Sequence, residues 1–182
     1  MKILNVDVLS NKLVTDNPVN RCYYCKQGVF GTILEAAKND GMTVILDGTN
    51  ASDDADDRPG MKALQEMKVL SPLRMCGYVK SEIRKQSKEA GLFVYNKPSY
   101  ACLATRIPTG TEIDEEKIKQ VETAETFLFD LGFSDFRVRW MDNKAKIQMP
   151  ESQLQALMEK REVVLEELSK IFDEVLLDLR TR

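Results

Sequence analysis

The chain has 182 residues, of which 43% are hydrophobic and 30% are charged, and its formal net charge is -3. This length suits one ordinary domain or two small ones, and the composition is that of a globular protein with enough apolar residues for a core. The slight acidic excess argues against a general nucleic-acid-binding protein, and no apolar run approaches the roughly 20 residues of a membrane helix.

The first residues, MKILNVDVLSNK, lack the long apolar stretch and the small-residue cleavage site of a signal peptide. We therefore expect a cytoplasmic protein with no membrane partner. Structural disulfides are rare in that compartment, where cysteines more often bind metals or take part in redox chemistry. The chain has four cysteines and no histidine, so any such chemistry would fall to the thiols.

Helical periodicity begins at Asn20, a suitable N-cap, and ends at Gly41. The stretch MTVILDGTN then predicts a buried strand, and the acidic loop ASDDADDRPG follows it. A short helix with Met61, Leu64 and Met67, a strand over KVLSPL and a helix over residues 81–90 come next. This alternation predicts an α/β fold with part of a parallel sheet. Two parallel strands cannot bury both faces of a sheet, so we expect the sheet to be incomplete in this chain.

After PSYACLATRIPTG the pattern changes to that of a smaller unit. A helix ends at Gly132, and FRVRWMDNKAKIQM predicts two strands joined by a turn at Asp142-Asn143. One long helix is expected after Pro150, and EVLLDL predicts a last strand. The apolar stripe of the long helix contains Leu154, Leu157, Met158, Leu165, Leu168 and Ile171. We therefore expect an α/β domain over residues 1–108 and a small α+β domain with a short antiparallel sheet over residues 109–182.

The C-x-x-C pair of Cys22 and Cys25 lies at the start of the first predicted helix. There the helix dipole and the unpaired N–H groups favour a thiolate, the form that binds metal or attacks sulfur. Zinc would need four ligands, an iron–sulfur cluster three or four thiolates, and a redox dithiol only the pair. The two cysteines could instead be buried as small hydrophobic residues.

Two further cysteines differ in their surroundings. Cys102 lies in a loop rich in turn-forming residues, and loop residues carry function more often than core residues do. Cys76 follows the second predicted strand and is expected to pack against it. We therefore predict that Cys22, Cys25 and Cys102 act together and that Cys76 does not, whereas a four-cysteine zinc site would need Cys76.

An acidic run follows the first predicted strand and comprises Asp53, Asp54, Asp56 and Asp57. Carboxylates can bind Mg²⁺, although this spacing is not that of an EF-hand and a solvated loop is the simpler explanation. The position favours a ligand, because ligands of open α/β sheets bind at the carboxyl ends of strands.

Arg137 and Arg139 alternate along a predicted strand, so both side chains lie on the same face. Two guanidinium groups there can clamp a phosphate or a carboxylate, or can simply form the polar outer face of a sheet. The sequence contains no Walker loop and no G-x-G-x-x-G motif.

Four motifs in this order, NRCYYCK, LDGTNASDDADDRPG, PSYACLATRIPTG and FRVRW, resemble the LarE-type sulfur transferases of the PP-loop ATP pyrophosphatase superfamily. The resemblance spans nearly the whole chain and implies a HUP-like fold for the first domain. It implies an enzyme that uses ATP and Mg²⁺ to adenylylate a substrate carboxylate and then inserts sulfur. The substrate would be a pyridinium dicarboxylate mononucleotide, the precursor of the nickel-pincer cofactor of lactate racemase. A homo-oligomer is also implied.

The resemblance also implies roles for individual residues. Cys22, Cys25 and Cys102 would hold a [4Fe–4S] cluster whose fourth iron handles sulfur, since Ala101 stands where another branch of the family has a sacrificial cysteine. Cys102 would thus be catalytic, as would Asp54, an acidic residue near the active centre. The residues expected to bind the phosphate of the nucleotide are Arg106, Arg137 and Arg139.

The family's Gly-rich SGG-x-DS loop, which binds ATP pyrophosphate, is not in this sequence, so the chain resembles the C-terminal two-thirds of such proteins. Two other functions are considered. A tRNA thiolation enzyme of the same superfamily would need a basic, aromatic face, which an acidic chain does not suggest. A zinc-stabilised binding module without catalysis would use all four cysteines.

Overall fold

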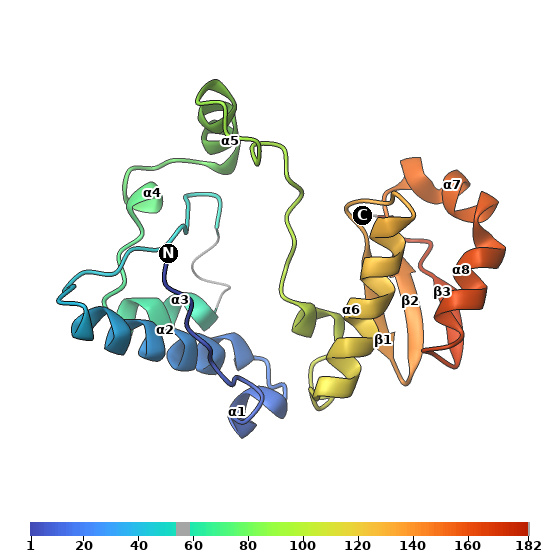
Figure 1. Cartoon of the computed structure of the whole chain (residues 1–182), viewed down its shortest axis with the longest axis horizontal. Helices are drawn as coiled ribbons and strands as arrows, with labels where there is room; N and C mark the ends of the chain where they lie inside the picture. The colour runs from blue at the N-terminus through green and yellow to red at the C-terminus, as the bar shows by residue number, and fades with distance from the viewer. Residues whose placement is uncertain (54–58, 182) are drawn as a thin grey trace. The chain divides into compact units, whose positions relative to one another are not determined.

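The computed structural model describes residues 1–53 and 59–181, and it divides into two compact units (Figure 1). Unit 1 comprises Met1–Lys97 and unit 2 comprises Pro98–Arg182. Residues 98–108, expected to close the first domain, thus belong to unit 2. The reason is a set of side-chain contacts, because both Tyr100 and Arg106 pair with Glu125 of unit 2.

Unit 1 consists of helices joined by irregular segments. Its helices are α1 (Lys12–Thr15), α2 (Arg21–Asn39), α3 (Pro59–Glu66), α4 (Pro72–Met75) and α5 (Lys80–Glu89). The sequence predicts α2, α3 and α5, whereas the short helices α1 and α4 were not expected. Helix α3 packs on α2, and a small core forms around Met61, Leu64 and Val69 with Phe30 against it.

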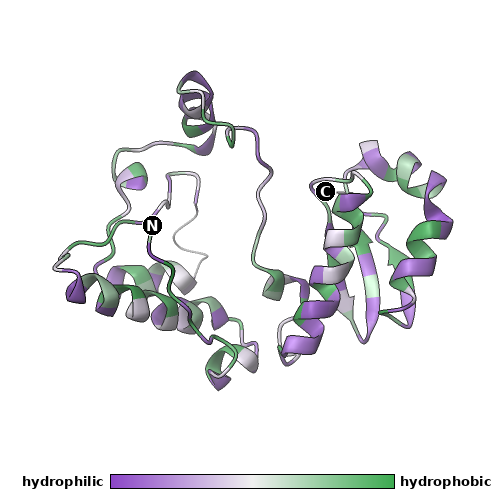
Figure 2. Ribbon diagram, viewed as in Figure 1, coloured by the Kyte–Doolittle hydropathy of each residue, from purple (hydrophilic) through white to green (hydrophobic). Residues whose placement is uncertain are grey.

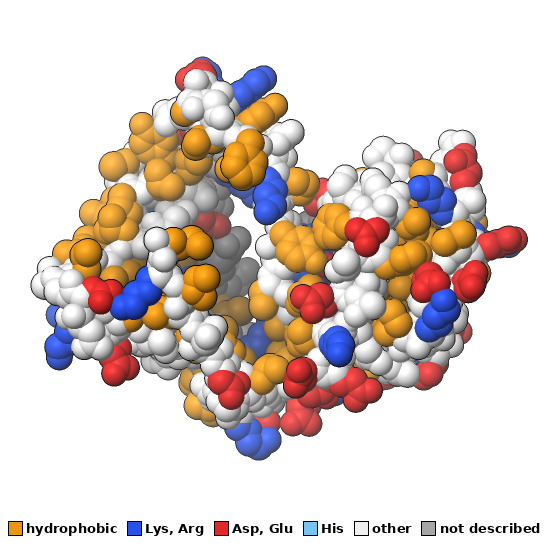
Figure 3. Space-filling model, in the orientation of Figure 1, with side chains coloured by type: hydrophobic (Ala, Val, Ile, Leu, Met, Phe, Trp, Pro, Cys, Tyr) orange, Lys and Arg blue, Asp and Glu red, His pale blue; other side chains and the backbone are white. Residues whose placement is uncertain are grey.

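The two strands expected in unit 1 are reduced, among its described residues, to one parallel bridge between Leu46 and Leu70. The Leu70 N–H donates to the Ile45 carbonyl at 3.0 Å, and the Asp47 N–H donates to the Leu70 carbonyl at 2.9 Å. The direction of pairing is the expected one, but an extended parallel sheet is not formed. Parallel strands need cover on both faces, and here Val44 and Leu46 are 58% and 60% exposed. Hydrophobic side chains accordingly gather on the surface of this unit (Figure 3). A PP-loop fold is not confirmed.

Unit 2 is an α/β unit with a three-stranded sheet in the order β1-β2-β3. Its elements are η1 (Leu103–Arg106), α6 (Glu115–Asp130), β1 (Arg137–Met141), β2 (Lys144–Gln148), η2 (Glu151–Gln153), α7 (Leu154–Glu159), α8 (Arg161–Leu168) and β3 (Glu174–Leu177), where η marks a 3₁₀ turn. The expected antiparallel sheet is in fact mixed. Strands β1 and β2 are antiparallel, but β3 runs parallel to β2 because a helical crossover returns the chain to the same end of the sheet.

The predicted turn between β1 and β2 is confirmed. Asp142 and Asn143 both have positive φ, 47° and 59°, as a two-residue type I′ hairpin requires. Along β1 and β2 hydrophilic and hydrophobic residues alternate (Figure 2). One face packs on the helices of the unit and forms its core. That core contains Ala124, Leu128, Phe133, Phe136, Val138, Ala145, Ile147, Met149, Leu157, Val164, Leu168 and Phe172.

The expectation of a single long helix after Pro150 is wrong. Helices α7 and α8 are separated at Lys160, whose φ and ψ are -100° and 12°. The Lys160 ammonium donates to the Leu131 carbonyl at 2.8 Å. Of the expected apolar stripe, Met158 and Leu165 are 54% and 40% exposed and line a surface pocket instead of the core. Among the residues that the structure describes, no helix combines the length and apolarity needed to cross a membrane.

Candidate functional site

Cys22 and Cys25 lie in the first two turns of α2, where they were expected. Their spacing of three places both thiols on one side of the helix. Cys22 is exposed and Cys25 is half-buried, and neither forms a disulfide. Asn20 occupies the N-cap position, but its side chain makes no capping hydrogen bond and its Nδ2 donates to the Tyr24 hydroxyl at 3.3 Å. The Cys22 thiol is thus exposed on unit 1, and the half-buried Cys25 lies on the same side of the helix.

An aromatic cavity of about 310 Å³ adjoins this turn, and its lining comprises Asn20, Tyr23, Tyr24, Pro59 and Lys62. The Tyr23 hydroxyl donates to Glu66 of α3 at 2.6 Å, and this bond raises the pKa of Tyr23. The Lys62 ammonium lies 5.8 Å from the centre of the Tyr23 ring. These contacts connect the cysteine-bearing end of α2 to α3.

The loop after the parallel bridge is ordered around Asp47. Its carboxylate accepts hydrogen bonds from the Ser71 hydroxyl at 2.6 Å and from the Thr49 hydroxyl at 2.5 Å. Burial opposes the ionisation of Asp47, but these hydrogen bonds outweigh it and lower the pKa. Farther along, Asp53 accepts from the Asn50 N–H at 3.0 Å. Asp54, predicted to be catalytic, lies outside the described residues.

Cys102 immediately precedes η1 in unit 2, and its side chain is exposed. Its backbone, in contrast, is held firmly. The Cys102 carbonyl accepts from the Thr105 N–H at 3.0 Å and from the Thr105 hydroxyl at 2.7 Å. Arg106 Nη1 donates to the carbonyls of Ala101 at 3.1 Å and Cys102 at 3.3 Å. An accessible thiol therefore stands on a fixed stretch of backbone.

Arg106 has a different environment from the one expected of a phosphate ligand. It is 1% exposed, and its Nε and Nη2 donate to the two carboxylate oxygens of Glu125 at 2.8 Å and 2.9 Å. Such a bidentate pair is among the strong hydrogen-bonded arrangements in proteins. All three guanidinium nitrogens of Arg106 are thus engaged within unit 2, and none is presented to a ligand in this conformation.

Arg137 and Arg139 both contact the segment that carries Cys102. Arg137 Nη2 donates to the Ser99 carbonyl at 2.7 Å, and Arg139 Nη1 donates to the Thr105 carbonyl at 3.2 Å. Arg137 is buried, whereas Arg139 is half-buried. Of the three predicted arginines, Arg139 is the one that a solvent-borne anion reaches most easily.

A second cation lies beside Arg139 on the polar face of the sheet. Lys146 of β2 is its partner across the strands. The Lys146 ammonium lies 3.0 Å from Asp178, and Gln148 donates to the same carboxylate at 2.7 Å. The hydrogen bond from Lys146 is the main reason why the pKa of Asp178 falls far below its usual range.

The structure therefore brings together four predicted residues in unit 2: Cys102, Arg106, Arg137 and Arg139. Cys22 and Cys25 belong to unit 1. Within neither unit do three cysteine or carboxylate side chains of the described residues gather as a metal site would require. Cys76 is exposed at the end of α4, so the expectation that it packs against the second predicted strand is wrong.

Two residues of this region, Glu125 and Tyr100, were missed. The Glu125 carboxylate is fully buried and accepts from Arg106, from the Tyr100 hydroxyl and from the Val138 N–H. A charge on the apolar face of α6, between Val121 and Leu128, was the sequence feature that could have revealed it.

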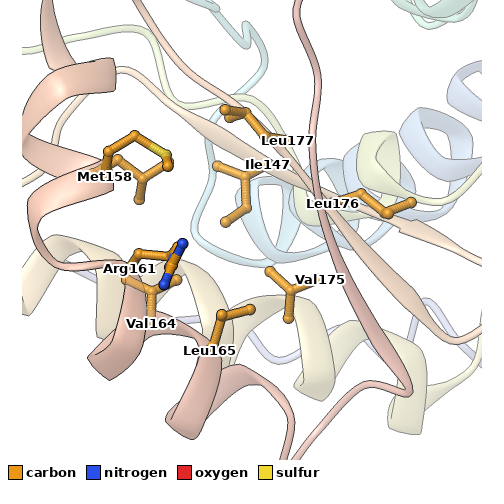
Figure 4. Close-up of a pocket in the computed structure, with 9 residues that line it drawn as sticks. Ile147, Met158, Arg161, Val164, Leu165, Val175, Leu176 and Leu177 are labelled. Atoms are coloured by element: carbon orange, nitrogen blue, oxygen red, sulfur yellow. The ribbon is translucent and has the colours of Figure 1, made fainter.

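A separate pocket of about 260 Å³ lies in unit 2 between β3 and the helices α7 and α8 (Figure 4). Its lining is apolar except for Arg161. The described residues that line it include none of the predicted cysteines or arginines.

No family model matches the chain, but three curated proteins are similar to it. It is 37% identical over 171 residues to an uncharacterised protein of Synechocystis sp., covering 94% of this chain and 63% of that protein. It is 34% identical over 149 residues to the pyridinium-3,5-bisthiocarboxylic acid mononucleotide synthase of Lactiplantibacillus plantarum, covering 82% of this chain and 54% of that enzyme. An uncharacterised protein of Methanocaldococcus jannaschii is 31% identical over 161 residues, covering 88% of this chain and 63% of that protein. The chain thus spans less than two-thirds of the length of these relatives.

Proposed function

We propose that this chain, over the part of its relatives that it spans, is a LarE-type sulfur transferase that serves in sulfur insertion into a pyridinium dicarboxylate mononucleotide. The similarity to a pyridinium-3,5-bisthiocarboxylic acid mononucleotide synthase supports both the enzyme class and the substrate. The product would be the precursor of a nickel-pincer cofactor. Neither tRNA thiolation nor a purely structural zinc module is favoured by these similarities.

One observation in unit 2 supports the proposal most directly. An exposed thiol, Cys102, stands on a backbone segment that Arg137 and Arg139 both contact. Sulfur transfer needs a thiolate or a sulfide close to the bound substrate, and guanidinium groups hold phosphate in defined geometry. We propose that Arg139, with Arg137 behind it, binds the phosphate of the nucleotide. Cys102 would lie close to the carboxylate that receives sulfur. Arg106 would then act indirectly, by holding the Cys102 segment.

We propose that Cys22, Cys25 and Cys102 hold a [4Fe–4S] cluster. The donor set fits, because thiolates are the ligands of such clusters and two of these thiols share one side of α2. When bound by three cysteines, the cluster leaves one iron that can hold the sulfur to be transferred.

The remaining parts of the proposal concern the whole reaction. Adenylylation of the substrate carboxylate would use ATP and Mg²⁺, with Asp54 as an acidic residue near the active centre. Unit 1 would be part of a PP-loop domain, and the parallel direction of the Leu46–Leu70 bridge supports this. We also propose a cytoplasmic homo-oligomer that binds a small nucleotide and no nucleic acid.

Anaerobic purification followed by iron, sulfide and zinc analysis and an absorption spectrum tests the cluster. We expect brown protein with about four irons per chain, lost in Cys102→Ser. Cys76→Ser is the matched control, since Cys76 is also an exposed thiol but is not in the proposed ligand set. Colourless protein with stoichiometric zinc, lost in Cys76→Ser as well, would replace the cluster with a four-cysteine zinc site. Wild-type protein that takes up no metal would contradict both.

A further inference from the structure

We propose that Glu125 is a positioning residue that fixes the Cys102 segment against strand β1, and thereby sets the distance between the Cys102 thiol and Arg137 and Arg139, the arginines proposed to bind phosphate. This inference rests on the proposed function of Cys102, Arg137 and Arg139. Glu125 itself is fully buried on α6 and touches no solvent, so it acts through its neighbours and not on the substrate.

The Glu125 carboxylate is saturated with donors. Oε1 accepts from Arg106 Nε at 2.8 Å and from the Val138 N–H at 2.8 Å. Oε2 accepts from Arg106 Nη2 at 2.9 Å and from the Tyr100 hydroxyl. These donors come from three places in the chain: the segment before η1, η1 itself and β1. A single side chain therefore ties three segments to α6.

On one side the connection runs to the thiol. Glu125 orients the Arg106 guanidinium, and the Nη1 group of that guanidinium then donates to the carbonyls of Ala101 and Cys102. These carbonyls flank the Cα atom that carries the exposed thiol. The position of Cys102 thus depends on the orientation of Arg106, which Glu125 sets.

On the other side the connection runs to the arginines of β1. The Val138 N–H that binds Glu125 lies between Arg137 and Arg139, so the bond fixes the register of this edge strand. The Tyr100 ring adds a second link, because the guanidinium carbons of Arg106 and Arg137 lie 5.1 Å and 5.6 Å from its centre. The same carboxylate thus holds both halves of the proposed site.

If the Arg106–Glu125 pair only stabilised the fold, its replacement by apolar residues would leave the Cys102 segment unchanged. Replacing a buried ion pair by apolar residues of similar size is often neutral or stabilising. A double variant, Arg106→Met with Glu125→Leu, should therefore fold, and the stability that it loses should come mainly from the Val138 N–H and the Tyr100 hydroxyl, which lose their acceptor. It would nevertheless lose every hydrogen bond from position 106 to the carbonyls of Ala101 and Cys102. Stability and positioning can be separated in this variant.

The first readout is amide hydrogen exchange in the full chain. We expect the amides of residues 99–107 to exchange about tenfold faster in the double variant and in Glu125→Gln, while β2 stays as protected as in the wild type. Glu122→Gln, an exposed carboxylate on the same helix, is the matched control and should change neither region. Tyr100→Phe, which removes one donor and keeps the ion pair, provides a milder variant if Glu125→Gln does not fold.

The second readout is the affinity for nicotinic acid mononucleotide, a pyridinium carboxylate nucleotide, measured by calorimetry. We expect binding about tenfold weaker in the double variant and unchanged in Glu122→Gln. A double variant with wild-type exchange in residues 99–107 would overturn the positioning role. Failure of the proposed function looks different: the wild type would bind neither iron nor the nucleotide, while the exchange difference between the variants would persist.

Discussion

Tyr100 shows at the scale of one residue how the site of unit 2 controls protonation. Its hydroxyl donates to the buried Glu125 carboxylate, and its ring lies beneath Arg106 and Arg137. Burial of the phenol and the hydrogen bond to Glu125 raise the pKa of Tyr100 to about 12. The two arginines act in the opposite direction and do not reverse the effect.

This shift predicts a pH dependence of stability. The folded state keeps the Tyr100 proton at pH values where the unfolded chain, with a pKa near 10, releases it. The contribution of Tyr100 to the free energy of unfolding is therefore complete below pH 10 and decreases as the pH rises from 10 to about 12. Urea unfolding across this range should show a steeper loss of stability in the wild type than in Tyr100→Phe. Equal slopes in the two proteins would refute the assignment.

The sequence suggests candidate residues more readily than it suggests their hydrogen-bond partners. Cysteine spacing makes Cys22 and Cys25 candidates, and strand alternation makes Arg137 and Arg139 candidates. The Arg106–Glu125 pair joins positions 19 residues apart, and no local periodicity encodes that meeting. Exposure of Cys76 was also missed, because a residue after a short helix can face either way.

Helix α6 illustrates the scale of one element. Its N-cap, Asp114, accepts a hydrogen bond from the Lys117 N–H at 2.8 Å. Burial opposes the ionisation of Asp114, but the bonds from Lys117 outweigh this and lower the pKa. Since Glu125 lies on the same helix, the cap stabilises the helix whose Glu125 carboxylate binds Arg106 and the Val138 N–H.

We predict that Asp114→Ala lowers the free energy of unfolding by about 1 kcal/mol at neutral pH. The lost stability comes from an ionised carboxylate with a lowered pKa. In the wild type this contribution is present above the unfolded pKa of 3.8 and is lost as the pH falls through the lower folded value. Chemical denaturation at neutral and acidic pH measures it. Asp114→Asn keeps an oxygen acceptor without the charge, so it should retain most of the stability and lose the pH dependence.

The hairpin turn offers a second prediction at this scale. Asp142 adopts a φ of 47°, a conformation that β-branched side chains rarely tolerate. Asp142→Val should therefore lower the free energy of unfolding by about 1–2 kcal/mol. Asp142→Gly is the control and should stay within about 0.5 kcal/mol of the wild type, because glycine populates this region freely. Denaturation midpoints of the two variants that coincide would contradict the turn geometry.

Features of unit 2 that depend on local sequence were predicted correctly, whereas features that depend on tertiary structure were not. The Asp142-Asn143 turn and the strand alternation are local features, and the structure confirms them. The interruption at Lys160, where the side-chain ammonium donates to the Leu131 carbonyl, is not revealed by the helical periodicity. Likewise, the parallel pairing of β3 with β2 depends on the path of the crossover and not on the strand sequence.

At the scale of the whole molecule the two units differ in their cores. Among the described residues, the core cluster of unit 2 contains twelve buried side chains, and that of unit 1 contains three. The sequence predicted this contrast in part, because two strands were not expected to complete a parallel sheet. Unit 1 indeed leaves Met42, Val44 and Leu46 exposed beside its single bridge.

This contrast predicts unequal local stability in the full chain. Opening free energies within one protein follow the density of buried apolar contacts. We expect the bridge amides of Asp47 and Leu70 to exchange at least about a hundredfold faster than the Asp178 amide, which donates to the Ile147 carbonyl beside the unit 2 core. Hydrogen exchange followed by NMR or mass spectrometry measures this difference.

A core truncation tests whether the units unfold separately. Leu64 is 2% exposed in unit 1, and Leu64→Ala should cost that unit about 2–5 kcal/mol. Exchange should accelerate across residues 1–97 and remain unchanged in β1 and β2, because the core of unit 2 does not include Leu64. The reciprocal variant, Leu128→Ala, should accelerate exchange in unit 2 and release the Cys102 segment, since Leu128 packs one turn from Glu125 on α6. Equal acceleration in both units by either variant would mean that they unfold as one cooperative body, and the thiols of the two units would then lose their positions together.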